Sequence, residues 1–172
     1  MGGSIAAKSG REKGTVFRVE LAFDRMEEKE ETETESEALA GKRLLLAEDD
    51  RLCGEILCEL LEDETGRPVS IAANGRAALE MFESANGEYD AIIMDVQMPV
   101  MNGYEAARAI RRSGCGNAKT VPIIALTADA SEESARSAAD SGMNGCLAKP
   151  VNIDRLRKAV AAALKSLSVA YR

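Results

Sequence analysis

Four short apolar runs of this sequence each end in residues that could do chemistry. These residues are three consecutive acids, one further acid, one hydroxyl and one amine, namely Glu48-Asp49-Asp50, Asp95, Thr127 and Lys149. Carboxylates held a few ångströms apart repel one another, so the pKa of at least one must rise unless a cation neutralises them. Mg²⁺ suits such a set, because it prefers oxygen ligands, uses one or two carboxylates and keeps waters that a phosphate can displace. The residue types therefore indicate phosphoryl transfer assisted by a divalent cation.

The chemistry of each side chain suggests its role. Asp95 is the candidate nucleophile, because a carboxylate can form an acyl phosphate. Lys149 and the cation would offset the charge on the equatorial phosphate oxygens, which is most of what catalysis of phosphoryl transfer requires. Thr127 would donate its hydroxyl to one of these oxygens. A single acid after a strand is more often a cap or turn residue, but capping alone explains the set at four strand ends poorly.

The elements that must position these residues alternate along residues 42–167. Apolar runs predict strands at 43–47, 69–72, 91–94, 121–126 and 145–148. Helical spacing and cap residues predict helices at 52–61, after Asn74-Gly75, at 103–112, after Ser131 and from Asn152. This alternation predicts an α/β fold, with a five-stranded parallel sheet that helices cover on both faces.

The order of the strands decides which residues meet. In a flavodoxin-like (βα)5 fold with strand order 2-1-3-4-5, sites form beyond the carboxyl ends of the strands, where the first and third strands are neighbours. We take this order from other doubly wound folds, since the sequence does not dictate it. Glu48, Asp49 and Asp95 would then share one crevice, flanked by Thr127 and Lys149.

The predicted helix at 52–61 also carries two of the four cysteines. Its spacing places Leu52, Ile56 and Leu60 on one apolar face, with Cys53, Leu57 and Leu61 beside it. Cys53 and Cys58 are therefore predicted to be packing residues. The sequence has no C-x-x-C pair and no His, which argues against a zinc site and indicates a reducing compartment.

The remaining segments flank this domain. Residues 1–24 are predicted to form a β-hairpin, with strands at 5–7 and 15–21 around a turn at 9–14. A lone hairpin is marginally stable in water, so its unpaired edges are expected to allow pairing with a second molecule. Residues 25–41 are predicted to be an acidic linker, and residues 168–172 a tail.

The charge of the chain excludes some partners. The formal net charge is −7, and residues 24–37 hold eight acids against two bases. An acidic chain without a basic cluster is a poor candidate for binding nucleic acid. No apolar run approaches the roughly 18 residues of a membrane span, and the first residues lack the plan of a signal peptide. We therefore expect no membrane contact by this segment, and a cytoplasmic location.

Four motifs together resemble the response-regulator receiver family over residues 42–167. They are LLLAEDD at 44–50, IIMDVQMPVMNG at 92–103, IALTA at 124–128 and Lys149-Pro150. The resemblance implies a phosphoryl group on Asp95 and Mg²⁺ bound directly by Asp49 and Asp95. It further implies metal contacts from Glu48 through water and from the Gln97 carbonyl, and phosphate contacts from Thr127, the Ala128 amide and Lys149. The Lys149–Pro150 peptide bond is expected to be cis.

The chain departs from this family at one position. Receivers usually carry an aromatic residue three positions before the Lys, and that residue moves inward together with the Thr on phosphorylation. Here the position holds Cys146, beside the expected switch residue Thr127. Since a small thiol cannot make the same movement, the resemblance leaves the coupling of phosphorylation to this face in question.

A second resemblance concerns the amino terminus. The strings MGGSI at 1–5 and GTVF at 14–17, with Ser9, look like the end of the ATP-binding domain of sensor histidine kinases. A receiver joined to such a domain by a polar linker is typical of a hybrid sensor kinase, whose parent protein can be membrane-anchored. The implied partners are a phosphohistidine domain of a histidine kinase and a histidine phosphotransfer protein. Without His and nucleotide-binding motifs, this chain is expected to lack kinase activity, although a receiver catalyses its own phosphorylation and dephosphorylation.

Three alternatives remain open. The chain could be a receiver that serves only as a docking surface, without phosphorylation. It could be an aspartyl-phosphate phosphohydrolase of similar fold, although such enzymes usually need a second Asp where this chain has Gln97. A flavin- or nucleotide-binding module would place Gly, Ser or Thr amides after the first strand, whereas the acids at 48–50 repel phosphate unless a metal intervenes.

Overall fold

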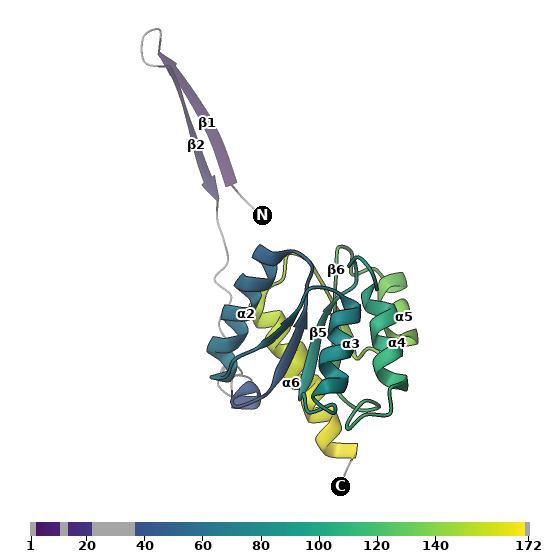
Figure 1. The fold of residues 1–172 in the computed structure, drawn as a ribbon. Coiled ribbons are helices and arrows are strands. Elements are labelled where there is room, and N and C mark those ends of the chain that lie inside the picture. Colours follow the sequence, from purple (N-terminus) through teal and green to yellow (C-terminus); the bar gives the residue numbers. More distant parts are fainter. Residues whose placement is uncertain (1–2, 11–13, 22–36, 171–172) are drawn as a thin grey trace. The chain divides into compact units, whose positions relative to one another are not determined.

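A computed structural model describes residues 3–10, 14–21 and 37–170 of the chain (Figure 1). The chain divides into two compact units, residues 1–31 and residues 32–172. In the first unit, strands β1 (Gly3–Gly10) and β2 (Gly14–Leu21) pair antiparallel, from Gly3 opposite Leu21 to Gly10 opposite Gly14. The predicted hairpin is present, with a first strand longer than expected, while residues 11–13 of its turn and residues 22–36 of the predicted linker lie outside the described residues.

The second unit is built on a five-stranded parallel sheet. Its strands are β3 (Leu44–Ala47), β4 (Ser70–Ala72), β5 (Ala91–Asp95), β6 (Ile123–Thr127) and β7 (Gly145–Ala148). They lie in the order β4-β3-β5-β6-β7. Numbered within this unit, the order is 2-1-3-4-5, so the predicted fold class is confirmed.

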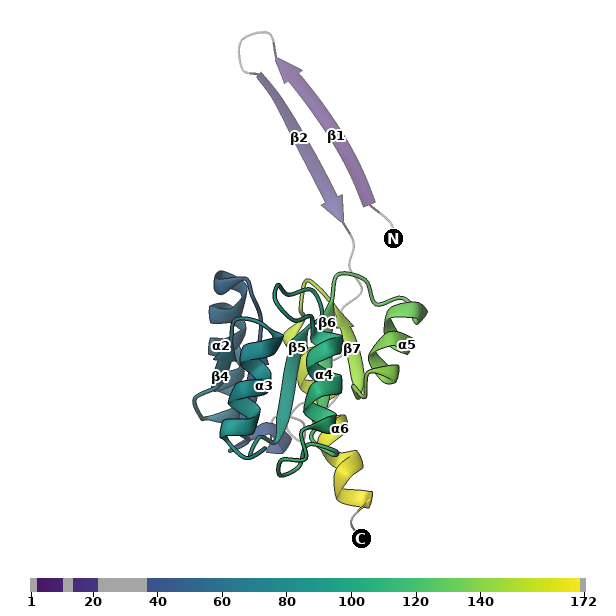
Figure 2. The same cartoon turned by 45° about the vertical axis from the view of Figure 1, so that its right-hand side comes forward.

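Helices cover both faces of this sheet (Figures 1 and 2). They are α2 (Arg51–Thr65), α3 (Gly75–Ser84), α4 (Gly103–Arg112), α5 (Glu132–Asp140) and α6 (Ile153–Ala170). Side chains that alternate along each strand feed two cores: Leu45 packs on the side of α3, α4 and α5, while Leu44 and Leu46 pack on the side of α2 and α6. The near-continuous apolar strands follow from this burial on both faces.

Polar side chains start the helices, and they include the two predicted caps, Ser131 and Asn152. Asp50, Asn74, Asn102 and Ser131 each accept a hydrogen bond from a backbone amide in the first turn of α2, α3, α4 and α5. Asn152 accepts from the Arg155 amide at 3.0 Å in the same way. These caps satisfy amides that the helix itself leaves without a partner. Within the described residues, no helix is long and apolar enough to cross a membrane.

The prediction for α2 was wrong in two respects. The helix continues to Thr65, where Gly66 ends it in the left-handed conformation at φ 65°. Leu52, Ile56 and Leu60 are exposed, and Leu57 and Leu61 face the core instead. Cys53 is exposed and is not a packing residue, whereas Cys58 is half-buried. Helical spacing identified two adjacent apolar rows, but only contact with the sheet decides which row is buried.

The amino-terminal edge of the second unit begins earlier than the sequence suggested. Residues 37–39 form a short helix inside the segment predicted as linker, and Leu39 is fully buried in the core beneath α2 and α6. The Gly41 amide donates to the Thr65 carbonyl at 2.7 Å, which fastens this segment to the end of α2. At the other end, α6 continues through Ala170, past the predicted start of a tail.

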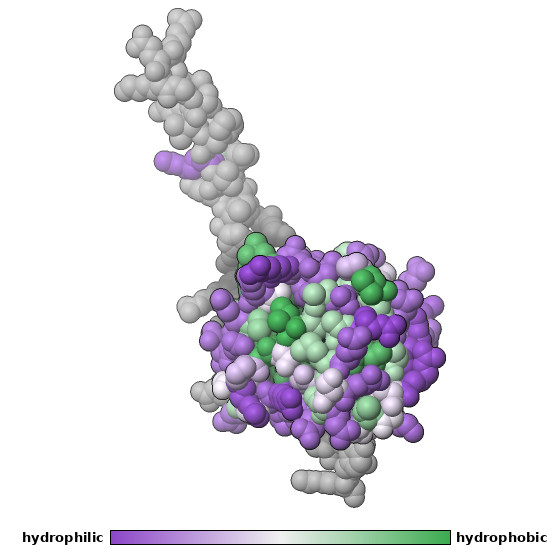
Figure 3. Space-filling view, in the orientation of Figure 1, coloured by the Kyte–Doolittle hydropathy of each residue, from purple (hydrophilic) through white to green (hydrophobic). Residues whose placement is uncertain are grey.

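The surface of the second unit is mainly hydrophilic on the face shown in Figure 3, with apolar side chains gathered near its middle. Ile71 of the edge strand β4 belongs to the exposed large apolar residues of the chain, at 42% exposure. It packs over Gly54 of α2, where a Cβ atom would lie 2.7 Å from its Cδ1. Gly54 therefore lets α2 approach the edge of the sheet closely.

Candidate functional site

The ends of four adjacent strands bring the predicted residues to one edge of the sheet. Glu48 directly follows β3, Asp95 is the last residue of β5, Thr127 is the last residue of β6, and Lys149 follows β7. Because the strands are parallel, their carboxyl ends meet at the same edge. The strand order, which the sequence did not dictate, is what makes these residues neighbours.

Three carboxylates form the centre of this edge. Glu48, Asp49 and Asp95 each offer an oxygen, and these oxygens all lie within 4.8 Å of one another. Glu48 is 3% exposed and Asp95 4%, while Asp49 is open to solvent. The three acids are thus brought together as predicted. Asp50 does not join it, because its carboxylate accepts from the Cys53 amide at 2.8 Å, a bond that lowers the pKa of Asp50.

Lys149 contacts this cluster from the end of β7, the edge strand of the sheet. Its Nζ lies 2.7 Å from Glu48 Oε2 and 2.6 Å from Asp95 Oδ2. The Lys149–Pro150 peptide bond is cis, as expected. The Lys149 ammonium therefore contacts two buried carboxylates. They lie at the carboxyl ends of the neighbouring strands β3 and β5.

The charges of the cluster are not balanced by Lys149 alone. Burial raises the pKa of Glu48, and the neighbouring Asp95 raises it further against the opposing effect of Lys149. Burial lowers the pKa of Lys149, but its hydrogen bonds to Asp95 and Glu48 outweigh this and leave the pKa raised. Lys149 thus stays protonated while the acids still repel one another. A divalent cation among the three carboxylate oxygens fits this donor set.

Backbone contacts fix the position of Asp95. The Gln97 amide donates to Asp95 Oδ1 at 3.1 Å, while the Gln97 side chain is exposed. A Cβ atom on Gly103, at the start of α4, would lie 2.2 Å from the Asp95 carbonyl oxygen. Only glycine lets α4 begin this close to the end of β5. The sequence placed Gly103 at a helix start and at the end of a receiver motif, but local patterns do not show its contact with Asp95.

The predicted switch residues belong to the neighbouring strands β6 and β7. Thr127 is buried, and its hydroxyl donates to the Asp129 carbonyl at 3.1 Å, within its own loop. Ala128 is exposed. Cys146 is half-buried on β7, opposite Ala125, and packs against the core beneath α4.

An aromatic side chain packs against the same core as Cys146, but it comes from another element. Burial raises the pKa of the Tyr104 hydroxyl, and the nearby Cys146 raises it further. Tyr104 belongs to the first turn of α4 and packs against the same core as Cys146. The sequence treated Tyr104 only as part of an apolar face, because helical spacing does not show which other residues share the core with that face.

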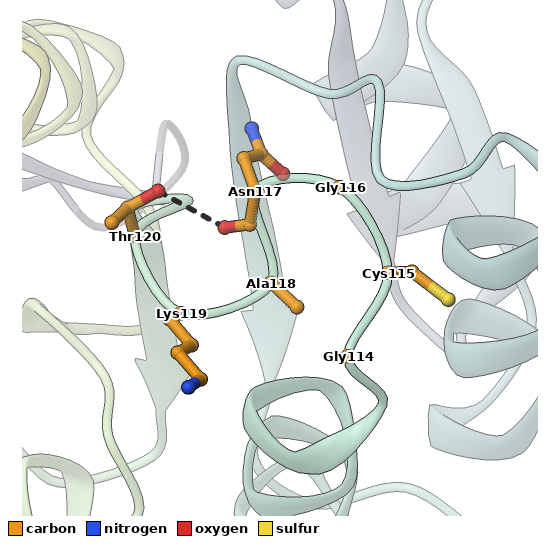
Figure 4. A pocket seen from close by; sticks show the side chains of 7 residues that line it. All are labelled: Gly114, Cys115, Gly116, Asn117, Ala118, Lys119 and Thr120. Atoms are coloured by element: carbon orange, nitrogen blue, oxygen red, sulfur yellow. Dashed lines mark hydrogen bonds between the residues drawn. The ribbon is translucent and has the colours of Figure 1, made fainter.

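A separate hollow lies away from this site. It has a volume of about 470 Å³ and is lined by residues 114–120 of the connection between α4 and β6, at the amino ends of the strands (Figure 4). Thr120 Oγ1 donates to the Asn117 carbonyl at 3.2 Å across its wall. Since no carboxylate lines this hollow, it offers none of the chemistry that the opposite edge does.

A flavodoxin-like sheet whose strand ends carry three acids, a threonine and a lysine defines a receiver domain of two-component signalling. The family model for the response regulator receiver domain matches residues 44–161, and the chain belongs to this family. The family resemblance of the four sequence motifs is thereby confirmed.

Curated relatives of the chain include histidine kinases and a sensor protein. The chain is 36% identical over 138 residues to "Probable histidine kinase 2" of Oryza sativa, a match that covers 73% of this chain and 13% of the relative. It is 32% identical over 158 residues to the aerobic respiration control sensor protein ArcB of Escherichia coli, covering 91% of this chain and 20% of the relative. The chain thus spans a fifth or less of the length of these relatives.

Solved structures of receivers share the fold. The receiver domain of the sensor histidine kinase PA1611 from Pseudomonas aeruginosa, with a magnesium ion in its active site cleft, is 36% identical with a TM-score of 0.62. That match covers 73% of this chain and 99% of the other. The co-crystal structure of the Saccharomyces cerevisiae phosphotransfer protein Ypd1 with the Ssk1 receiver domain matches at 32% identity and a TM-score of 0.62, covering 71% of this chain and 88% of that one.

Proposed function

We propose that this receiver accepts a phosphoryl group from a phosphohistidine onto Asp95, in a Mg²⁺-dependent reaction, and relays it to a histidine phosphotransfer protein. The observation that carries this proposal is the cluster of Glu48, Asp49 and Asp95, whose oxygens lie within 4.8 Å of one another with Lys149 bonded to two of them. The alternative, a receiver used only for docking without phosphorylation, does not explain why these acids lie together.

The proposed transfer is a displacement at phosphorus. An oxygen of the Asp95 carboxylate forms the new P–O bond while the P–N bond to the histidine breaks, and the electron pair of that bond stays with the imidazole nitrogen. Lys149 is already 2.6 Å from Asp95 Oδ2, so its ammonium is placed to take up charge on the transferred group. Thr127 would turn its hydroxyl from the Asp129 carbonyl to a phosphate oxygen, and the Ala128 amide would donate to another. Transfer onward to the phosphotransfer protein reverses these steps.

The metal site of the proposal uses the acids at the ends of β3 and β5. Asp49 and Asp95 would bind Mg²⁺ directly, with Glu48 acting through water and the Gln97 carbonyl as a further ligand. The bound ion would neutralise the acids and stabilise the charge of the transferred group. The magnesium ion in the cleft of the PA1611 receiver, a related domain, supports this assignment.

The parent protein of the proposal is a hybrid sensor kinase. Support comes from the histidine kinases that the chain resembles, and from the ArcB match, which at 91% of the chain extends beyond the receiver. Residues 1–24 would be the end of the kinase ATP-binding domain and residues 25–36 an acidic linker. The receiver would span residues 37–170, because Leu39 is buried in its core and α6 continues to Ala170. The Ypd1–Ssk1 complex supports a phosphotransfer protein as partner. A cytoplasmic location fits the four free cysteines.

The intact mass of the chain after incubation with acetyl phosphate tests this function. We expect the wild type to gain one phosphoryl group when Mg²⁺ is present and none when it is chelated. Asp95→Asn should gain none, because the amide cannot act as the nucleophile. Asp140→Asn, which changes an exposed acid at the end of α5, is the matched control and should behave as wild type. A folded wild type that gains no mass with Mg²⁺ would favour the docking-only alternative.

A further inference from the structure

Three consecutive acids connect β3 to α2, and each has different contacts. Glu48 is buried and accepts from Lys149 Nζ at 2.7 Å. Asp50 is exposed and accepts from the Cys53 amide at 2.8 Å. Within the part of the chain that the structure describes, the Asp49 carboxylate takes part in no hydrogen bond or ion pair. Asp49 therefore keeps its oxygens available, although it stands between two acids that are bound.

The amino end of α2 attracts carboxylates. The first amides of a helix have no acceptor within the helix, and the aligned peptide dipoles add a partial positive charge at this end. A nearby anion is therefore drawn to these amides. Asp50 occupies the position as the cap of α2, with an extended backbone at φ −76° and ψ 111°. The helix is thus satisfied by an acid that does not belong to the cluster of Glu48, Asp49 and Asp95.

The start of α2 also lies close to this cluster. The Gly54 amide donates to the Asp50 carbonyl at 2.8 Å, near the start of the helix. A Cβ atom on Gly54 would lie 3.6 Å from Glu48 Cγ, so the helix packs on the buried acid with no side chain between them. Asp49, directly before the cap, is the next carboxylate along the chain that can accept from the first amides. Only the cap at Asp50 separates it from them.

We infer that Asp50 is a positioning residue for the metal site: by capping α2, it keeps the Asp49 carboxylate away from the helix and free to bind Mg²⁺. The inference rests on the proposed function and deepens it, because it explains how two adjacent residues of the same type take different tasks. Without the cap, the Asp49 carboxylate would turn to the first amides of α2, and the metal would lose a direct ligand.

Mg²⁺ binding to two neutral variants tests this role. Asp50→Asn and Asp50→Ala both remove the charge, but only Asn retains an oxygen that can accept from the Cys53 amide. We expect Asp50→Ala to bind Mg²⁺ about tenfold or more weakly than Asp50→Asn, as measured by isothermal titration calorimetry.

The matched control changes the other end of the same helix. Gly66 ends α2 in the left-handed conformation at φ 65°, with no atom within 4 Å of where a Cβ would lie. Gly66→Ala therefore strains the backbone without a clash, and should destabilise the fold to a degree similar to Asp50→Ala. Its affinity for Mg²⁺ should equal that of the wild type, because this end of α2 lies away from the cluster.

Urea unfolding without Mg²⁺ gives a second measurement. In the wild-type background, Asp49→Ala should not destabilise the fold, because the Asp49 carboxylate has no partner and repels the neighbouring acids. In the Asp50→Ala background, Asp49 would serve as the cap, and the same substitution should raise the unfolding equilibrium constant about fivefold.

Three results would overturn the inference. They are equal Mg²⁺ affinities of Asp50→Asn and Asp50→Ala, a Gly66→Ala chain that binds Mg²⁺ as weakly as Asp50→Ala, and an effect of Asp49→Ala that is the same in both backgrounds. Each leaves the proposed function standing as long as the wild type binds Mg²⁺ and gains a phosphoryl group from acetyl phosphate. A folded wild type that does neither would contradict the proposed function, and the inference with it.

Discussion

The two ends of the five-stranded sheet differ in how their charged side chains are paired. At the carboxyl ends, Glu48 and Asp95 are buried within reach of each other and of Asp49, with one ammonium for the three acids. At the amino ends, Arg111 donates to the carbonyls of Gly142 at 2.9 Å and Ala118 at 2.8 Å, and to Asn144 Oδ1 at 3.1 Å. One end gathers like charges, whereas at the other end Arg111 donates to three acceptors.

This difference separates function from stability. Burial lowers the pKa of Arg111. Its three hydrogen bonds join α4 to the connections before β6 and β7. Asn144 adds to this by accepting from the Ile123 amide at 2.9 Å. Buried acids without enough counter-charge are unfavourable for the fold and are kept where chemistry needs them. Substitutions at the carboxyl ends should therefore change reactivity, and those at the amino ends should change stability.

The largest effect is expected at Asp95. Asp95→Asn should abolish phosphorylation by acetyl phosphate, as measured by intact mass, while the thermal midpoint stays near that of the wild type. The fold tolerates the change because Lys149 keeps its bond to Glu48 at 2.7 Å. A loss of folded protein in circular dichroism would contradict the prediction, because substitutions at the carboxyl ends would then change stability as well as reactivity.

Leu39→Ala should give the largest loss of stability. Leu39 is fully buried beneath α2 and α6, so its truncation leaves a cavity and should cost about 2–5 kcal/mol in unfolding free energy. Urea unfolding measures this, and Ala162→Ser, at an exposed position of α6, is the control. A loss of unfolding free energy near zero would contradict this prediction and would mean that residues 37–41 belong to the linker.

Arg111→Met should cost less. The substitution removes three hydrogen bonds and leaves the Ala118 and Gly142 carbonyls with one partner fewer, which should lower the unfolding free energy by about 1–3 kcal/mol. The rate of phosphorylation by acetyl phosphate should stay at the wild-type value. Slower phosphorylation with an unchanged unfolding free energy would contradict the view that the amino ends of the strands serve stability and not reactivity.

The smallest effect concerns pH and the carboxyl end. The pKa of Glu48 is raised above its usual 4.5, so the folded chain binds its proton more tightly than the unfolded chain does. The stabilisation that this gives is present below pH 4.5 and is lost as the pH rises through the raised pKa. In Mg²⁺-free buffer, Glu48→Gln should therefore gain stability relative to the wild type as the pH rises through this range. Urea unfolding at several pH values measures the difference, and an unchanging difference would contradict the prediction.

The predictability of the elements differed between α4 and α2. For α4, the sequence predicted both ends correctly, because Asn102 and Glu105 form a capping box and the basic Arg111 and Arg112 close the last turn. For α2, two adjacent apolar rows fit the helical spacing equally well. The row of Leu57 and Leu61 became part of the core, and the row of Leu52, Ile56 and Leu60 is exposed. Periodicity measures how apolar residues are spaced, and not what lies opposite them.

The sequence by itself determined the alternation of strands and helices, the caps, and the types of side chain at each strand end, because these depend on neighbouring residues. It could identify Asp95 and Lys149 as candidates, 54 residues apart in the chain. Only the tertiary structure decided that Lys149 bonds both Glu48 and Asp95, that Gly103 packs on the Asp95 backbone, that Tyr104 and Cys146 pack against the same core, and that Leu39 belongs to the core. Each of these contacts joins separate elements across the sheet, so it depends on strand order and packing distance, which local patterns do not contain.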